Sequence, residues 1–295
     1  MATSGKFTSA YNVESTEIIE SPMATDSTLD LDAAASFYMK LDGDLTNSGS
    51  GTYDTAGSGG TVALCATSQP FGTHNAQFSS GYIDTKISGQ ALNIQSGAIS
   101  IWFKGSSADL AASANTTIFG VLDYDGPDNE GIQGVVKSDF AAFDLRGSDG
   151  VYNRALIYSS AFGDWTDDEW HHYVGMWNNA SGGTIWIDGV CAAASTAMIY
   201  ADGVSNSWTL YIGASHHSTF GSVPQQPMTG GLDDFRFYPG INLTSAQIQE
   251  LYLKDDLAYG LTSGGKWYME GFIEDAPGIK ITSGYSMYAT QFTEI

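Results

Sequence analysis

Apolar and polar residues alternate over short stretches of the chain, which is the pattern of strands buried on one face only. The clearest stretch is Ala98–Lys104, where Ile99, Ile101 and Phe103 share one face and the residues between them share the other. Short strands separated by glycine-rich turns predict an all-β protein. By alternation or apolar runs, further strands are expected at Ala35–Asp44, Gln77–Ile83, Thr116–Leu122, Phe140–Arg146, Arg154–Tyr158, Asp167–Trp177 and Trp208–Gly213, and a hairpin is expected at Thr184–Cys191.

The segment Gly230–Tyr252 has the pattern of a strand, a turn and a short helix. Strict alternation places Asp233 on the same face as the two phenylalanines that follow, and we expect this face to be buried. A buried carboxylate needs hydrogen-bond donors or a metal ion. After the turn, Thr244 can cap the helix together with Gln247 three residues later.

These landmarks follow one another in the order of a known family. The stretch Ala98–Lys104 has the pattern apolar-Ser-apolar-Trp-apolar-Lys. Further along the chain, Asp167–Trp177 contains Trp-His-His and is followed by the hairpin turn Asp188-Gly189. The segment Gly230–Tyr252 comes last. Over residues 35–253 the chain resembles the laminin-G-like (concanavalin A-like) jelly-roll family. The resemblance implies an all-β fold, an antiparallel jelly-roll β-sandwich of two sheets packed face to face.

The resemblance divides the 295 residues into three parts. Residues 1–34 are polar and rich in Ser and Thr, so we expect an extended N-terminal arm. Residues 35–253 form the expected sandwich, in which the stretch 47–60 should be a polar loop. Residues 254–295 have the pattern of a small C-terminal β extension. Because a few exposed strands are marginal alone, we expect the extension to pair with the sandwich or with another subunit.

Composition narrows the classes of function. The formal net charge is −22 with 11 basic residues, which excludes a broad basic surface for nucleic acid and disfavours anionic membranes and sulfated polymers. No apolar run is long enough for a transmembrane helix, and the first residues lack the pattern of a secretory signal. The spacing of Cys65 and Cys191 requires no disulfide; we expect two buried thiols, and their pairing stays open.

Calcium is the metal that the sequence favours, because it takes oxygen ligands such as Asp carboxylates. The resemblance implies it as well, since many members of that family hold calcium. Asp42, Asp44 and Asp233 are candidate ligands, because the first and closing strands lie close together in the family. The acidic loop with Asp123 and Asp125 is a second candidate. The alternatives are turn-stabilising hydrogen bonds and, for Asp233, hydrogen bonds from backbone amides.

Catalysis and a histidine metal site are less favoured. Related jelly rolls include glycoside hydrolases, which need two carboxylates beside the scissile bond. The Glu-x-Asp-x-(x)-Glu strand of retaining jelly-roll hydrolases does not occur, so we assign no catalytic residue. His171 and His172 alternate along a strand and cannot chelate one ion; one should be buried and hydrogen-bonded and the other nearer solvent. His216 and His217 are expected in an exposed loop.

Glycan binding would use exposed aromatic rings near the loops at one end of the sandwich, together with polar side chains. Trp165, Tyr152, Tyr200 and Phe220 are the candidates, because each lies in or near an expected loop. An aromatic residue in such a place can equally anchor the loop to the core. The sequence alone leaves both roles open.

These observations favour a non-enzymatic structural or adhesion protein. The terminal arm and extension indicate a virion component, such as a phage capsid decoration, tail or fibre protein, assembled in the host cytoplasm. Its expected partners are further copies of itself and other virion proteins, contacted through both termini, and a cell-surface glycan. The alternatives are an extracellular, calcium-assisted carbohydrate-binding module and a glycoside hydrolase or lyase on the same fold.

Overall fold

The structure is a computed structural model that describes residues 29–51, 57–66, 70, 72–92, 95–110, 116–123, 130–146, 152–159, 165–195, 208–217 and 224–258. The sandwich lies in the compact unit Thr25–Tyr252. Most of the predicted arm and of the predicted C-terminal extension lies outside the described residues, so the three-part division stays a prediction.

Each strand expected in the sandwich is present. The helices of the described residues are α1 (Leu31–Ala34), the 3₁₀ helix η1 (Gly89–Leu92) and α3 (Ser245–Ala258). The strands are β1 (Phe37–Met39), β2 (Gly57–Cys65), β3 (Asn75–Ser88), β4 (Ser96–Ser106), β5 (Thr116–Asp123), β6 (Glu130–Val136), β7 (Phe140–Arg146), β8 (Tyr152–Tyr158), β9 (Asp167–Asn178), β10 (Gly182–Ile187), β11 (Val190–Ala194), β12 (Thr209–Ile212), β13 (Ser215–His217) and β14 (Met228–Pro239).

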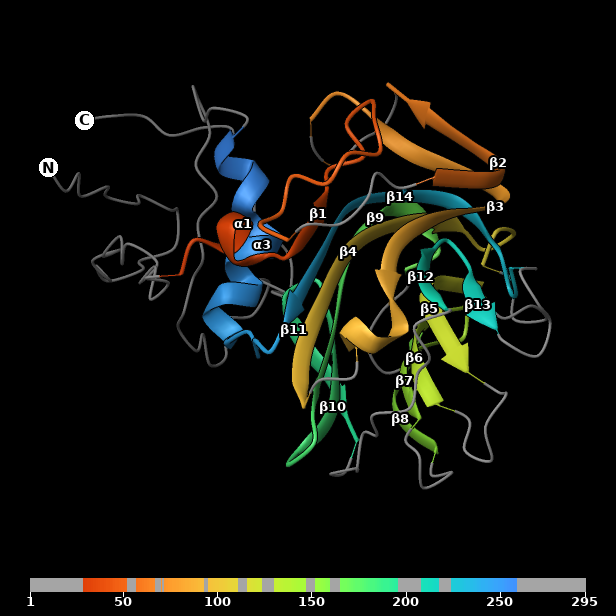
Figure 1. Ribbon diagram of the computed structural model, residues 1–295. Coiled ribbons are helices and arrows are strands. Elements are labelled where there is room, and N and C mark those ends of the chain that lie inside the picture. Colours follow the sequence, from red (N-terminus) through yellow and green to blue (C-terminus); the bar gives the residue numbers. More distant parts are fainter. Residues whose placement is uncertain are drawn as a thin grey trace, which may run out of the picture. The chain divides into compact units, whose positions relative to one another are not determined.

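Hydrogen-bonded strands follow one another in the order β11-β10-β9-β4-β14-β3-β12-β5-β6-β7-β8. β1 is added beside β14, β2 beside β3 and β13 beside β5, and only the pairing of β13 with β5 is parallel among those described. The sheet curves so that β9, β4 and β14 face β5, β6, β7 and β8 (Figure 1). This arrangement confirms the expected antiparallel jelly-roll sandwich.

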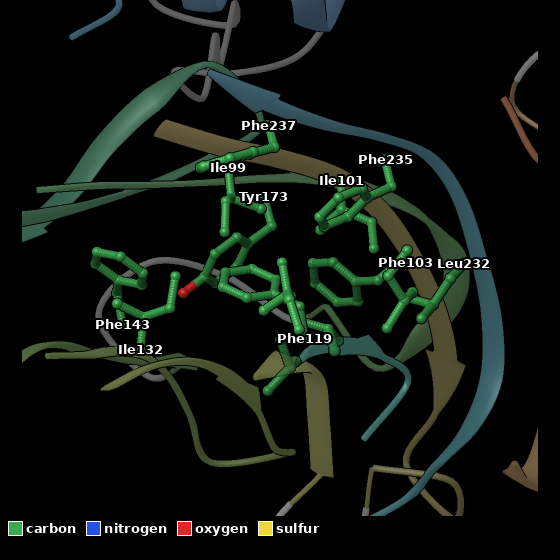
Figure 2. Close-up of a cluster of buried hydrophobic side chains, with 14 of the residues drawn as sticks. Ile99, Ile101, Phe103, Phe119, Ile132, Phe143, Tyr173, Leu232, Phe235 and Phe237 are labelled. Carbon is green, nitrogen blue, oxygen red and sulfur yellow. The ribbon is translucent and has the colours of Figure 1, made fainter. Parts of the chain in front are cut away.

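The main hydrophobic core fills the space between the two layers (Figure 2). Ile99, Ile101 and Phe103 of β4 are fully buried there, on the face that the alternation predicted. Phe119 and Phe143 meet them from the opposite layer. Burial of a large apolar side chain contributes roughly 1.5–3 kcal/mol, so this cluster is the main source of stability.

A β-bulge interrupts the alternation of β14. Between the pairs Asp233–Trp102 and Arg236–Ser100, two residues of β14 stand opposite one residue of β4. Asp234, one of these two, has a φ of 50°, in the left-handed region that Asp tolerates better than most residues. The bulge shifts the facing pattern by one residue.

This shift makes the expected face of Asp233 wrong. Leu232, Phe235 and Phe237 all point into the core (Figure 2). Asp233 instead stands opposite Trp102 and faces away from the core, although it is fully buried. Period-2 alternation cannot reveal an inserted residue, which is why the sequence placed Asp233 beside the phenylalanines.

Helices α1 and α3 cover the face of β14 and β4 that points away from the core (Figure 1). The expected capping box is confirmed: the Thr244 amide donates to Gln247 Oε1 (2.8 Å) and the Gln247 amide to Thr244 Oγ1 (3.3 Å). Ile248 and Leu251 of α3 pack in a second apolar cluster with Leu31 of α1. The last residues of the predicted extended arm are therefore a helix that packs on the sandwich.

A buried ion network lies in this second layer. Arg236 is 1% exposed, and its Nη2 donates to Tyr38 Oη (2.7 Å) and Asp234 Oδ1 (3.0 Å), with Asp32 Oδ1 at 3.3 Å. Burial opposes the charge of Arg236, but the neighbouring acidic groups, led by Asp234, raise its pKa above the ordinary value. The network ties α1 to β14.

Two strands and the cysteines differ from the expectation. β2 begins at Gly57, inside the expected polar loop, because its glycine and serine residues hide any alternation. β6 was not predicted; Gly134 interrupts its apolar pattern, and a Cβ there would lie 2.6 Å from the Phe119 ring. Cys65 is half-buried, Cys191 is exposed and the two are unpaired, so the expectation of two buried thiols is wrong.

Candidate functional site

The loop after β1 contains two of the predicted calcium ligands, Asp42 and Asp44. Asp42 Oδ1 accepts hydrogen bonds from the Thr73 amide (2.5 Å) and hydroxyl (2.6 Å) and from the His74 amide (3.0 Å). Asp44 Oδ1 accepts from the Thr46 hydroxyl (2.6 Å) and amide (2.9 Å). These hydrogen bonds, led by those from the hydroxyl groups, lower the pKa of both carboxyl groups. Both carboxylates have the loop-stabilising role that was the alternative to calcium binding.

The structure does not group the other predicted calcium ligands with these two. β1 pairs with β14 as expected, but Asp233 is buried and accepts a hydrogen bond from the Asp234 amide (2.9 Å). Asp123 is the last residue of β5, and Asp125 lies outside the described residues. Within the described ranges, no three His, Cys, Asp or Glu side chains are arranged to hold a metal ion.

Calcium binding at either loop stays a prediction. At a tenfold excess of calcium over its Kd, the free energy of unfolding is expected to rise by about 1.4 kcal/mol relative to EDTA-treated protein. Calorimetric titration and the thermal midpoint measure this directly. Asp42→Asn would remove the calcium-dependent part if the ion binds after β1, and would leave it unchanged if the ion binds beside Asp123. A midpoint indifferent to calcium contradicts both sites.

The expected exposed loop at His216 and His217 is a buried strand. β13 pairs with β5, and both histidines are 5% exposed. His216 stacks on Tyr211 with 4.4 Å between ring centroids, and meets Trp208 edge-on at 4.8 Å. Burial lowers the pKa of both imidazoles, to about 4 for His217. A His-His dipeptide has no strand signal of its own, so only the pairing with β5 reveals its burial.

His171 and His172 point to opposite faces of β9, as expected. His172 is 1% exposed, with Nε2 2.8 Å from Ser100 Oγ, and burial together with a nearby guanidinium lowers its pKa to about 3. His171 lies between Asp188 (2.8 Å) and Asp167 (3.1 Å). Burial opposes its charge, but the two carboxylates raise its pKa overall. The two imidazoles cannot share one ligand.

Of the four aromatic glycan candidates, the structure describes one side chain. Trp165 is 1% exposed, belongs to the main core and donates from Nε1 to the Lys137 carbonyl (2.6 Å). Trp165 is therefore a loop anchor, the alternative that the sequence left open. The side chain of Tyr152, and all of Tyr200 and Phe220, lie outside the described residues.

The outer face of β7 and β8 contains the strongest candidate site. Ala141, Phe143 and Leu145 of β7 and Ala155 and Ile157 of β8 face the core, so the even-numbered residues of these strands face outward. Phe140 stands opposite Tyr158, and Asp144 opposite Arg154, about 13 Å further along the strands. We call the outward set the outer strip; its described side chains are Phe140, Ala142, Asp144, Arg146, Arg154, Leu156 and Tyr158.

The outer strip combines an aromatic pair, of which Tyr158 is exposed, with an ion pair between the exposed Arg154 and the buried Asp144. Tyr158 is 55% exposed, and its partner Phe140 is half-buried with Lys137 Nζ 5.0 Å from its ring centroid. Arg154 Nε and Nη2 donate to the two carboxylate oxygens of Asp144 (2.6 and 2.9 Å). A bidentate pair fixes the plane of the guanidinium group, which gives it a defined direction for polar contacts.

Buried polar side chains extend the outer strip across the neighbouring strands. Gln133 of β6 stands opposite Asp144, and its Nε2 donates to Thr117 Oγ1 (2.5 Å) and Gln226 Oε1 (2.6 Å). From the core side, the Tyr173 hydroxyl donates to a carbonyl of β7 (2.8 Å), and burial together with Asp144 raises its pKa well above the ordinary value. The strip is thus held rigid from both sides.

The fold places this protein in a class of lectin-like sandwiches. The chain belongs to the family Laminin_G_3, of the concanavalin A-like lectin/glucanases superfamily, whose model matches residues 79–249. No curated protein matches the chain. Among the described helices, none is long and apolar enough to cross a membrane.

Solved structures with low sequence identity share the fold. Domain 4 of AbnA, a GH43 extracellular arabinanase from Geobacillus stearothermophilus, in complex with arabinotriose, is 18% identical, with a TM-score of 0.53, over 75% of this chain and 99% of that one. The receptor binding domain of botulinum neurotoxin mosaic serotype C/D is 15% identical (TM-score 0.54; 77% and 52%). The binding domain of botulinum neurotoxin DC in complex with SialylT is also 15% identical (TM-score 0.53; 76% and 52%). The chain spans about half the length of these neurotoxin domains.

Proposed function

We propose that the sandwich is a non-enzymatic carbohydrate-binding domain that holds a glycan along the outer strip. The observation that carries this proposal is the exposed Tyr158 ring beside the half-buried Phe140, on the same face as the exposed Arg154 guanidinium that the buried Asp144 holds in place. Aromatic rings provide apolar contact area for a sugar ring, and fixed polar groups orient its hydroxyl groups.

The exposed part of the outer strip favours a short oligosaccharide. Its exposed side chains, Arg154 and Tyr158, lie four residues apart along β8, which corresponds to about 13 Å, whereas Ala142 and Asp144 of β7 are buried. The family's description as lectins and glucanases supports sugar as the ligand. The arabinotriose complex of the AbnA domain supports it further, because this chain matches almost the whole length of that domain.

Substitution of Tyr158 tests the site. Against a panel of plant, bacterial and animal oligosaccharides, Tyr158→Ala is expected to weaken binding of the recognised glycan about tenfold, a loss of about 1.4 kcal/mol. The matched control is Val190→Ala on β11, because Val190 is a comparably exposed apolar residue (50%) outside the strip. Equal affinities of the two variants in calorimetric titrations would remove the outer strip from the proposal.

The same titrations distinguish binding from hydrolysis. We expect the recognised oligosaccharide to be recovered intact after prolonged incubation, and release of new reducing ends would replace this proposal with the glycoside hydrolase alternative. The expected virion setting stays a prediction, on which neither the fold nor the similar structures bears. Repeating the glycan titration of the wild-type protein in EDTA shows whether glycan binding depends on calcium.

A further inference from the structure

The geometry of β2 points to a surface for self-association. We propose that β2 pairs in antiparallel fashion with β2 of a second copy of this chain, with Ala63 on the two-fold axis. The pairing would join the sheets of two sandwiches edge to edge. It is independent of the glycan proposal, because β2 and the outer strip belong to different parts of the sheet.

β2 is an open edge of the sheet. It pairs with β3 on one side, and among the described residues nothing pairs with its other side (Figure 1). Along an edge strand, alternate backbone N–H and C=O groups point outward and can pair with another chain. The other two ends of the sheet, β8 and β11, lie close to each other. β2 is therefore the edge best placed to accept a strand.

β2 lacks the charged residues and prolines that usually prevent an edge strand from pairing with another chain. Its sequence, GSGGTVALC, contains no charged residue and no proline. A bulge at Thr61, which stands opposite both Ser79 and Ser80 of β3, interrupts the pairing, but Val62–Cys65 pairs regularly with β3 beyond it. In a chain with a net charge of −22, an uncharged edge is a place where two copies can approach without bringing acidic groups together.

The side chains of Thr61–Cys65 are self-complementary about Ala63. With Ala63 opposite its own copy, Val62 stands opposite Leu64, and Thr61 stands opposite Cys65. Val62 and Leu64 are each half-buried and pack against the main core. Pairing would extend that apolar contact across the two-fold axis, which is why we choose a second copy over an unrelated strand.

Five residues of strand bury less surface than the roughly 1,200–2,000 Å² of a stable interface, so the dimer should be weak and depend on concentration. Sedimentation equilibrium of the full chain over a wide concentration range measures it. Because like net charges repel, added salt should strengthen the association. A chain that remains monomeric at every concentration and salt level overturns the proposal.

Substitution on the two-fold axis tests the surface. Ala63→Lys places two like charges opposite each other, and we expect the dissociation constant to rise at least tenfold. The side chain of Ala63 is exposed, so the fold should be kept, which the thermal midpoint verifies. Val190→Lys on β11 is the matched control, since it adds the same charge to another edge strand. Equal self-association of the two variants would show that copies meet elsewhere, for instance through the terminal segments.

A cross-link tests the register without relying on affinity. Thr61→Cys would stand opposite Cys65 of the other copy, within the 4.4–6.8 Å between Cα atoms that a disulfide spans. Combined with Cys191→Ser, which removes the exposed thiol, this variant should form a covalent dimer under mild oxidation, and the Cys191→Ser protein alone should form far less. If the variant self-associates but does not cross-link, the proposed register is wrong.

Discussion

Replacement of Arg236 by methionine is expected to lower the free energy of unfolding by about 3–5 kcal/mol. The guanidinium group is buried, and its Nη2 atom makes hydrogen bonds to Asp234 and Tyr38 and an ion pair with Asp32. Methionine fills a similar space, but it leaves the Asp234 carboxylate, 3% exposed, without its counter-charge. Such an uncompensated buried charge is far more damaging than the loss of a surface ion pair.

A second variant separates the charge from the packing. Arg236→Met combined with Asp234→Asn removes both members of the pair, and we expect it to recover much of the lost stability. Asparagine is chosen because it tolerates the φ of 50° at this position. Urea unfolding of the four proteins in the cycle gives the coupling energy. A single variant that loses less than about 1 kcal/mol would show that the network is solvated and weak.

Acidification from pH 6.5 to pH 5 is expected to remove about 1.6 kcal/mol of stability through His172 alone. Its folded pKa is about 3, whereas an unfolded histidine titrates near 6.5. Between these values the unfolded state binds a proton that the folded state excludes, so stability falls as pH falls. His216 and His217, whose pKa values are also lowered, add losses of the same sign. His171, with a raised pKa, opposes them, because its stabilisation is present below pH 6.5 and lost as pH rises through its folded pKa.

His172→Gln isolates the contribution of this residue. The variant should lose stability overall, because the site is closely packed, but its pH dependence below 6.5 should be shallower by up to 1.36 kcal/mol per pH unit. The measurement is the free energy of unfolding from denaturant curves at several pH values between 5 and 7.5. If wild type and variant keep parallel curves over this range, the lowered pKa of His172 is not coupled to folding.

Alternation predicted the strands well where no residue is inserted. In β4 the apolar positions at Ile99, Ile101 and Phe103 face the core as expected. In β14 the same rule fails after Leu232, because the bulge at Asp234 inserts one extra residue. Asp234 has a positive φ, and nothing in the sequence pattern indicates this conformation. Sequence patterns therefore predict which segments are strands better than which way their side chains point.

The outer strip was beyond sequence reasoning for a different reason. β7 and β8 were both expected, but their register and their place at one end of the sheet come from long-range pairing. The available signal was the placement of aromatic and charged residues at even-numbered positions of both strands, as in Phe140, Asp144 and Arg146 followed by Arg154 and Tyr158. That signal indicates the outward face of each strand. Only the register of β7 and β8 shows that their two outward faces form one surface.

The pairing of β1 with β14 has a mechanical consequence. Phe37, at the start of β1, stands opposite Phe237, near the end of β14, so the chain enters and leaves this strand pair at the same end. Tension applied through the two flanking segments, once α1 and α3 have been pulled away, loads the three residue pairs one after another instead of all together. An antiparallel pair pulled in this way opens like a zipper. β1 should therefore separate from β14 at a smaller force than one that loads all three pairs at once.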